Sequence, residues 1–156
     1  MVKILPVKDF ELIYSQEILN VNFFSAVEIT RGLLKKFNHQ ALSNIIFISA
    51  IWSKLGDKGN SIYAASKGAL DSLVKTLAVE LGPRVRVNSI LPGAIKTKMS
   101  ESAFSNPDIL ARYDQEYILG LGEIEDIIHL VEFLISYKAK WITGQHLILD
   151  GGKTSH

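Results

Sequence analysis

The sequence predicts an α/β protein with a small parallel sheet of about three strands and helices on both faces. Three short apolar runs carry this prediction, because they do not alternate with polar residues, and such runs are typical of strands buried on both faces. Each run follows a segment whose apolar residues have helical spacing. Strands that are joined through helices by right-handed crossovers run parallel in one sheet.

The expected elements follow one another along the whole chain. The expected helices are 9–19, 20–37, 62–82 and 123–137. The expected strands are 44–49, 85–90 and 146–149. A polar stretch at 98–122 separates the second strand from the last long helix, and one or two short helices are expected in it around 107–117. This stretch is long enough to be a lid over a substrate.

The composition indicates one globular domain, residues 1–156, and excludes several classes of protein. The 17 Lys and Arg residues nearly balance the 16 Asp and Glu residues, so there is no basic field for nucleic acid or for an anionic membrane. The chain has no cysteine, which excludes disulfides and thiolate chemistry. It has no apolar run of the roughly 18 residues that span a membrane, and its first residues do not form a signal peptide. We therefore expect a cytoplasmic protein.

Tyr63 and Lys67 are the first candidates for chemistry. They stand four residues apart on an expected helix and so share one face. An ammonium beside a phenol favours the phenolate, so we expect Lys67 to lower the pKa of Tyr63 and to let it exchange a proton with an alcohol or carbonyl. The pair follows a buried strand, which places Tyr63 near the carboxyl end of the sheet, where ligands bind. Taken alone, the pair fits an ordinary exposed helix surface better than a catalytic site.

Several further segments surround this pair in a fixed order. They are Asn20-Val21-Asn22, Ile48-Ser49-Ala50, Arg86-Val87-Asn88, Pro92-Gly93 with Thr97, and Thr143-Gly144 with Asp150-Gly151-Gly152. In order and spacing, from about residue 9 to 152, the chain resembles the short-chain dehydrogenase/reductase family. The resemblance implies a partial Rossmann-like, doubly wound parallel sheet. It also implies hydride transfer between NAD or NADP and a small alcohol or carbonyl substrate.

The resemblance also implies a role for individual residues. Tyr63 matches the catalytic acid and base, and Lys67 matches the residue that tunes it and binds the nicotinamide ribose. Asn22 matches the asparagine that anchors a water near this lysine, whereas Asn20 stands two places early and is expected on the helix surface.

A second set of residues matches the part of the family that surrounds the nicotinamide. Pro92, Gly93 and Ile95 correspond to the backbone wall beside the ring, and Thr97 corresponds to the hydroxyl that binds its carboxamide.

The chain departs from the family at the residue that binds the substrate oxygen. The family has a hydroxyl thirteen residues before the tyrosine, and this chain has Ala50 there. Ser49 is adjacent, but neighbours on a strand point to opposite faces, so it is expected to face away unless a bulge turns it back. Ser53 in the following loop is another substitute. The loss of one such donor slows catalysis by about 10²–10³-fold.

A second departure concerns the adenine side of the cofactor. None of the glycines forms the G-x-x-x-G-x-G turn that binds the pyrophosphate in the family, so the βαβαβ half that precedes the present elements is expected to be missing. The strand at 44–49 would then be an apolar sheet edge, which favours pairing with other chains. We expect a homo-oligomer through the helices 20–37 and 62–82, which form dimer contacts in the family.

Two other interpretations stay open beside the enzyme. The chain could be a non-catalytic module that pairs with itself or with a longer relative, or the remnant of a gene that is broken or starts upstream. The four histidines, His39, His129, His146 and His156, have no metal-ligand spacing, so we expect no metal site. Trp141 is expected to pack beneath the last strand.

Overall fold

A parallel three-stranded sheet forms the centre of the structure, a computed structural model that describes residues 5–35, 41–98 and 100–155. The strands lie in the order β1-β2-β3 and correspond to the three apolar runs of the sequence. Their bounds are β1 (Asn44–Ile48), β2 (Arg86–Pro92) and β3 (His146–Leu149). Both neighbouring pairs are parallel, as expected, with Ile45 opposite Val87 and Ile90 opposite Leu147.

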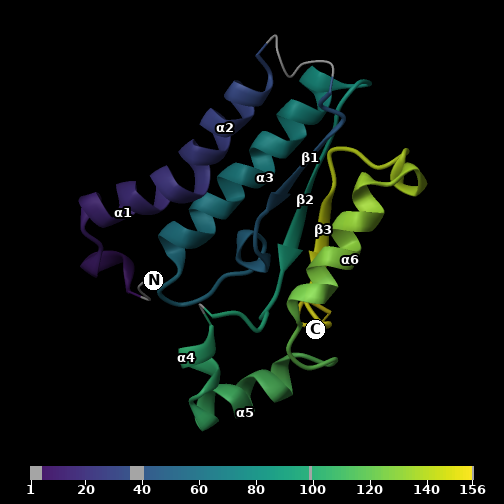
Figure 1. Cartoon of the computed structure of the whole chain (residues 1–156). Helices are drawn as coiled ribbons and strands as arrows, with labels where there is room; N and C mark the ends of the chain where they lie inside the picture. Colours follow the sequence, from purple (N-terminus) through teal and green to yellow (C-terminus); the bar gives the residue numbers. More distant parts are fainter. Residues whose placement is uncertain (1–4, 36–40, 99, 156) are drawn as a thin grey trace.

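Helices cover both faces of this sheet (Figure 1). The α-helices are α1 (Leu12–Leu19), α2 (Ser25–Leu33), α3 (Ser61–Leu81), α4 (Glu101–Phe104), α5 (Pro107–Glu116) and α6 (Ile124–Ile135). Short helical turns are η1 (Val7–Asp9), η2 (Asn20–Phe24), η3 (Ile51–Ser53) and η4 (Tyr137–Ala139). In Figure 1, α2 and α3 lie on one side of the sheet and α6 lies on the other. The described part of the chain therefore has the α/β layers that the sequence predicts.

The first two expected helices form one continuous helical run. The turn η2 is π-helical and joins α1 directly to α2, so no loop separates them. One extra residue in such a turn rotates the face that the helix presents, and π turns are frequent at functional sites. This turn carries Asn20 and Asn22.

Two apolar clusters hold the layers together. The first lies between the sheet and α3 and includes Phe47, Leu70, Val74 and Val87. The second lies between the sheet and α6 and is built around Ile90 and Leu134, both of which are fully buried. The side chains of β2 feed both clusters because neighbours on a strand point to opposite faces. This explains why the second apolar run lacks polar alternation.

Several residues of the family pattern prove to be structural. The Arg86 guanidinium donates to the carbonyl of Leu134 at 2.7 Å and so binds the end of α6 to β2. The buried Asn88 side chain donates to the Ile142 carbonyl and accepts from the Gln145 backbone, both at 3.0 Å. These bonds fix the turn that leads into β3, so the Arg-Val-Asn segment positions the last strand rather than a ligand.

The segment 98–122 lies beyond the carboxyl ends of the strands. It contains α4 and α5, in agreement with the expected short helices, and both stand below the strand ends in Figure 1. The side chain of Asn106 caps α5 by accepting from the Asp108 backbone at 2.9 Å. That this segment acts as a substrate lid stays a prediction.

One packing expectation was wrong. Trp141 does not pack beneath β3, because 95% of its surface is exposed. It lies at the surface just after the end of η4, where its indole is exposed to solvent. None of the described helices combines the length and the apolar character that a membrane span needs.

Candidate active site

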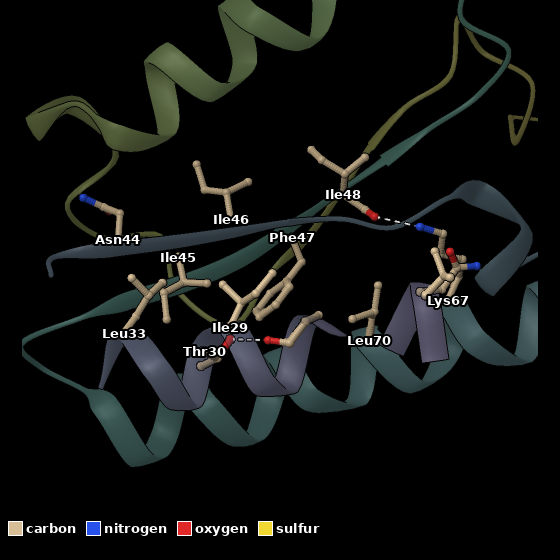
Figure 2. Close-up of a pocket in the computed structure, with 13 residues that line it drawn as sticks. Ile29, Thr30, Leu33, Asn44, Ile45, Ile46, Phe47, Ile48, Lys67 and Leu70 are labelled. Atoms are coloured by element: carbon tan, nitrogen blue, oxygen red, sulfur yellow. Dashed lines mark hydrogen bonds between the residues drawn. The ribbon is translucent and has the colours of Figure 1, made fainter. Parts of the chain in front are cut away.

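Tyr63 and Lys67 lie one helical turn apart near the start of α3. The Lys67 Nζ lies 5.7 Å from the centroid of the Tyr63 ring. The same Nζ donates a hydrogen bond of 3.0 Å to the carbonyl of Ile48, the last residue of β1 (Figure 2). This bond fixes the ammonium at the carboxyl end of the strand, the end near which the sequence leads us to expect Tyr63. The other N–H groups of the ammonium can bind the hydroxyls of a ligand.

Asn22 is joined to this pair through a serine that the sequence analysis missed. Its Nδ2 donates to the Ser66 Oγ at 3.0 Å, and the Ser66 Oγ donates to the Tyr63 carbonyl at 2.7 Å. Ser66 is fully buried, and Asn20 is exposed as expected. The π turn therefore brings Asn22 to the first turn of α3. The sequence carries no signal for this role of Ser66, because its burial and its bond to Asn22 depend on the packing of η2 against α3.

The electrostatics of the pair differ from the sequence expectation. Burial raises the pKa of Tyr63 above its ordinary value, where the sequence led us to expect a lowered one. Burial also lowers the pKa of Lys67, although the charge of Asp71 acts in the opposite direction. Desolvation penalises the charged form of each group. It dominates here because the Lys67 ammonium is bound to Ile48 and lies over the ring, not at the hydroxyl.

None of the three substrate-side candidates offers a hydroxyl that is free of hydrogen bonds within the protein. Ala50 is buried and has no hydroxyl. The Ser49 Oγ donates to the Lys67 carbonyl at 3.2 Å, and Ser49 is buried on the side of α3. The Ser53 Oγ donates to the Asp71 carboxylate at 2.6 Å. Both serines are thus engaged with α3, and their substitution for the missing serine stays a prediction without support from these contacts.

An open groove of about 470 Å³ runs along β1 and reaches Lys67. Ile29 and Leu33 of α2 line one wall, and the side chains of β1 line the other (Figure 2). Asn22 and Lys67 belong to the same lining. The rest of the lining is mostly apolar, although Thr30 and Asn44 add polar groups to it away from Lys67 (Figure 2).

The expected nicotinamide wall forms a second group of residues at the end of β2. Gly93 donates its N–H to the Leu149 carbonyl, and Ile95 pairs with Gly122 in an isolated parallel bridge. Thr97 shares a 3.1 Å hydrogen bond with the Ser100 Oγ, which also donates to the Ile95 carbonyl. These bonds fix the backbone from Pro92 to Thr97, and in the described residues no hydrogen bond joins it to the side chains of Tyr63 or Lys67.

Tyr117 supports this wall and was not identified from the sequence. It is buried, and burial raises the pKa of its hydroxyl to about 12, while a hydrogen bond with the Ala94 backbone acts in the opposite direction. A Cβ placed on Gly93 would lie 2.8 Å from the Tyr117 Cε1 and 2.9 Å from the Asp150 Cα. Only glycine fits at this position, because the ring and the backbone of the last turn occupy the space.

We expect Gly93→Ala to lower both the melting temperature and the affinity for a nicotinamide cofactor. The new methyl group would displace Tyr117 or the Asp150 backbone, since contacts below 3.0 Å are not tolerated. Thermal unfolding and a cofactor titration measure the two effects. Gly32→Ala is the matched control: its Cβ would meet no atom within 4 Å, and alanine in a helix is favoured by about 1 kcal/mol. Equal melting temperatures for the two variants would contradict the tight fit at Gly93.

The structure offers no metal centre in its described residues, where no group of three acidic, histidine or cysteine side chains could hold an ion. His129 is exposed on α6, and His146 faces Asp71. His39 and His156 lie outside the described residues.

Comparison with known proteins decides the family. A family model described as enoyl-(acyl carrier protein) reductase matches residues 4–154. L-xylulose reductase from Bos taurus is 33% identical over 139 residues, which are 85% of this chain and 56% of that protein. The chain belongs to the short-chain dehydrogenase/reductase family. The human dehydrogenase/reductase SDR family member 4 is similar as well, with 34% identity over 139 residues, 88% of this chain and 50% of that protein.

Solved structures of the family agree with the fold. A 4-hydroxyisoleucine dehydrogenase complexed with NADH has a TM-score of 0.93 and 31% identity, and the match covers 100% of this chain but 65% of that chain. A gluconate 5-dehydrogenase from Burkholderia cenocepacia, complexed with NADP and tartrate, has a TM-score of 0.92 at 23% identity, with 100% of this chain and 62% of that chain covered. This short-chain dehydrogenase/reductase chain thus spans little more than half the length of its curated relatives.

Proposed function

We propose that the chain is an NAD(P)-dependent oxidoreductase that interconverts small alcohols and carbonyl compounds, with impaired activity when it acts alone. The observation that carries the proposal is the arrangement of Tyr63 and Lys67 on α3, with the Lys67 Nζ bound to the Ile48 carbonyl at the carboxyl end of β1. Similar proteins have been solved in complex with NADH and with NADP. The donors of Lys67 and Thr97 and the backbone at Gly93 suit the ribose and carboxamide of a nicotinamide nucleotide.

The residues divide the chemistry between them. When bound, a reduced nicotinamide supplies the hydride that reaches the carbonyl carbon of the substrate. Tyr63 gives its hydroxyl proton to the substrate oxygen, so that the carbonyl π bond is replaced by a C–H and an O–H bond. Lys67 stabilises the phenolate that forms, and Asn22 holds the first turn of α3 through Ser66. Burial raises the pKa of Tyr63 and keeps it protonated at neutral pH, which favours its role as an acid in carbonyl reduction.

The impairment follows from the substrate side. Ala50 offers no hydroxyl to the substrate oxygen, and Ser49 and Ser53 are bound to α3. The given sequence also lacks the glycine turn that binds the pyrophosphate on the adenine side of the cofactor, because it contains no G-x-x-x-G-x-G segment.

The second candidate is a non-catalytic module that associates with itself or with a longer relative. It is favoured by the groove beside β1 and by exposed apolar side chains such as Phe24 and Ile29 on η2 and α2 and Val79 on α3. We also propose a homo-oligomer through the helical run that ends at Leu33 and through α3, and a cytoplasmic location. Light scattering of the purified chain measures the oligomeric state.

A calorimetric titration with NADH and with NADPH tests the enzyme proposal. Binding with a micromolar dissociation constant supports it, and Ala50→Ser is then expected to raise the rate of carbonyl reduction by about 10²–10³-fold, as the gain of one such hydrogen-bond donor predicts. Ala65→Ser, at an exposed position of α3, is the matched control that adds a hydroxyl without changing the rate. An absence of binding at millimolar cofactor would reject the oxidoreductase proposal for this chain and favour the non-catalytic module.

A further inference from the structure

A buried polar cluster lies directly beside the candidate active site, and no step of the proposed reaction uses it. Its centre is the Asp71 carboxylate, one helical turn after Lys67 on α3. Asp71 has 3% of its surface exposed. A carboxylate is rarely buried to this degree unless hydrogen bonds and cations compensate for its lost hydration. The cluster therefore needs an explanation beyond packing.

Groups from three other elements converge on this carboxylate. The Ser53 Oγ donates to its Oδ2 at 2.6 Å, and the Lys54 Nζ lies 3.1 Å from the same atom. On the sheet side, the Ser89 Oγ lies 3.3 Å from Oδ1, and the His146 Nδ1 lies 3.7 Å from it. The loop after β1 and the strands β2 and β3 are thus joined to α3 at one charge.

The number of protons available on Ser89 and His146 fixes the direction of the hydrogen bonds between the sheet and Asp71. The Ser89 Oγ has one proton and two partners, Asp71 Oδ1 and the His146 Nδ1 at 2.8 Å. Both contacts are satisfied when Nδ1 carries a proton and donates to Ser89, which then donates to Asp71. The carboxylate thus accepts along a chain that begins at His146.

The charges in the cluster favour an ionised Asp71. Burial acts to raise the pKa of its carboxyl, but the hydrogen bonds from Ser53 and Lys54 act in the opposite direction, and the pKa lies below its ordinary value. Burial lowers the pKa of His146, while the charge of Asp71 raises it and those of Lys54 and Lys75 lower it. Asp71 is therefore a fixed negative charge at neutral pH.

Lys67 stands four residues before Asp71 on α3, although the two side chains form no direct ion pair. Residues four apart on a helix are neighbours, and Lys67 has lost much of its hydration at the end of β1. We propose that Asp71 is a positioning residue of the active site, which keeps the Lys67 ammonium charged beside Tyr63 and holds the loop from Ala50 to Lys54 against α3. The proposal rests on the proposed function for its catalytic meaning, but the interaction itself exists without a cofactor. It also explains why Ser53 is not free to replace the missing serine.

The titration of Lys67 tests the proposal in the chain without cofactor. Lysine labelled with 13C at Cε reports its own ionisation by NMR, and Lys67→Arg identifies the signal. We expect Asp71→Asn to move the midpoint of the Lys67 titration to lower pH. Asp71→Glu should move this midpoint back towards the wild-type value. Asp57→Asn is the matched control, because Asp57 is exposed in the preceding loop and its hydrogen-bond partner is Asn60. An unmoved midpoint in a folded Asp71→Asn variant would overturn the proposal.

A second variant keeps the proposal testable if Asp71→Asn does not fold. Lys54→Met removes the cation that neutralises Asp71 from the loop side, where 42% of the lysine side chain is exposed. The Lys67 midpoint is then expected to rise, whereas Lys58→Met should leave it unchanged. No rise would show that the charges of this cluster do not reach Lys67. Failure of the proposed function would give a different result: the chain would not bind a nicotinamide cofactor, but the variants would still shift the midpoint of the Lys67 titration as expected.

Discussion

Replacing Tyr63 by phenylalanine is expected to slow carbonyl reduction by about 10²–10⁴-fold, the usual contribution of a general acid. The change removes the Tyr63 hydroxyl, the proposed proton donor, and keeps the ring over which Lys67 lies. Because the wild-type chain has Ala50, the rates are best compared in the Ala50→Ser background. Steady-state reduction of a small carbonyl compound, followed by the loss of NAD(P)H absorbance, measures the effect.

The design of this comparison separates chemistry from binding and from stability. Tyr137→Phe removes an equivalent hydroxyl from an exposed tyrosine in η4, far along the chain, and is expected to leave the rate unchanged. Calorimetry should give Tyr63→Phe nearly the affinity of its parent for NAD(P)H, because Lys67 keeps its bond to Ile48. Equal rates for the two phenylalanine variants would contradict the assignment of Tyr63 as the acid.

The sheet could be predicted from the sequence because its signal is local. The run Ile45 to Ile48 has no polar residue to mark an exposed face, and Pro92-Gly93 ends the next strand visibly. Parallel pairing then follows from the helices between the strands. The π turn at Asn20–Phe24 was less accessible, since one additional residue in a helical turn leaves no clear change in the spacing of apolar residues.

The functional residues divide in the same way. Tyr63, Lys67 and Asn22 stand at spacings that the family shares, so the sequence could single them out as candidates. Ser66 and Tyr117 could not be found in this way, because what matters about them is a hydrogen bond to a distant element or a ring against Gly93. Contacts of this kind depend on packing between elements that the sequence leaves undetermined.

Electrostatic direction was the hardest property to predict. The spacing of Tyr63 and Lys67 correctly indicates proximity, but it contains no information about water. The fold removes water from both groups, and desolvation then reverses the expected shift in the pKa of Tyr63. The same limit applies to Asp71, whose sequence context is an ordinary helix and whose partners Ser53, Ser89 and His146 come from three separate elements.

Leu134→Ala is expected to lower the free energy of unfolding by about 2–5 kcal/mol, the range for a leucine removed from a packed core. Leu134 is fully buried between α6 and the sheet and packs in the cluster of Ile90 and Ala139. The sheet has three strands, so few other contacts can compensate for the cavity. The Leu134 carbonyl, which accepts from Arg86, is unchanged by the substitution, and the effect therefore reports packing alone.

Ile135→Ala provides the comparison on the same helix. Ile135 is the next residue of α6 and has 54% of its surface exposed, so its truncation should cost well under half as much as that of Leu134. Urea unfolding followed by circular dichroism measures both variants at one protein concentration. Equal losses would mean that another copy of the chain covers this face of α6 in solution, because only an occupied surface could make Ile135 as costly to truncate as Leu134.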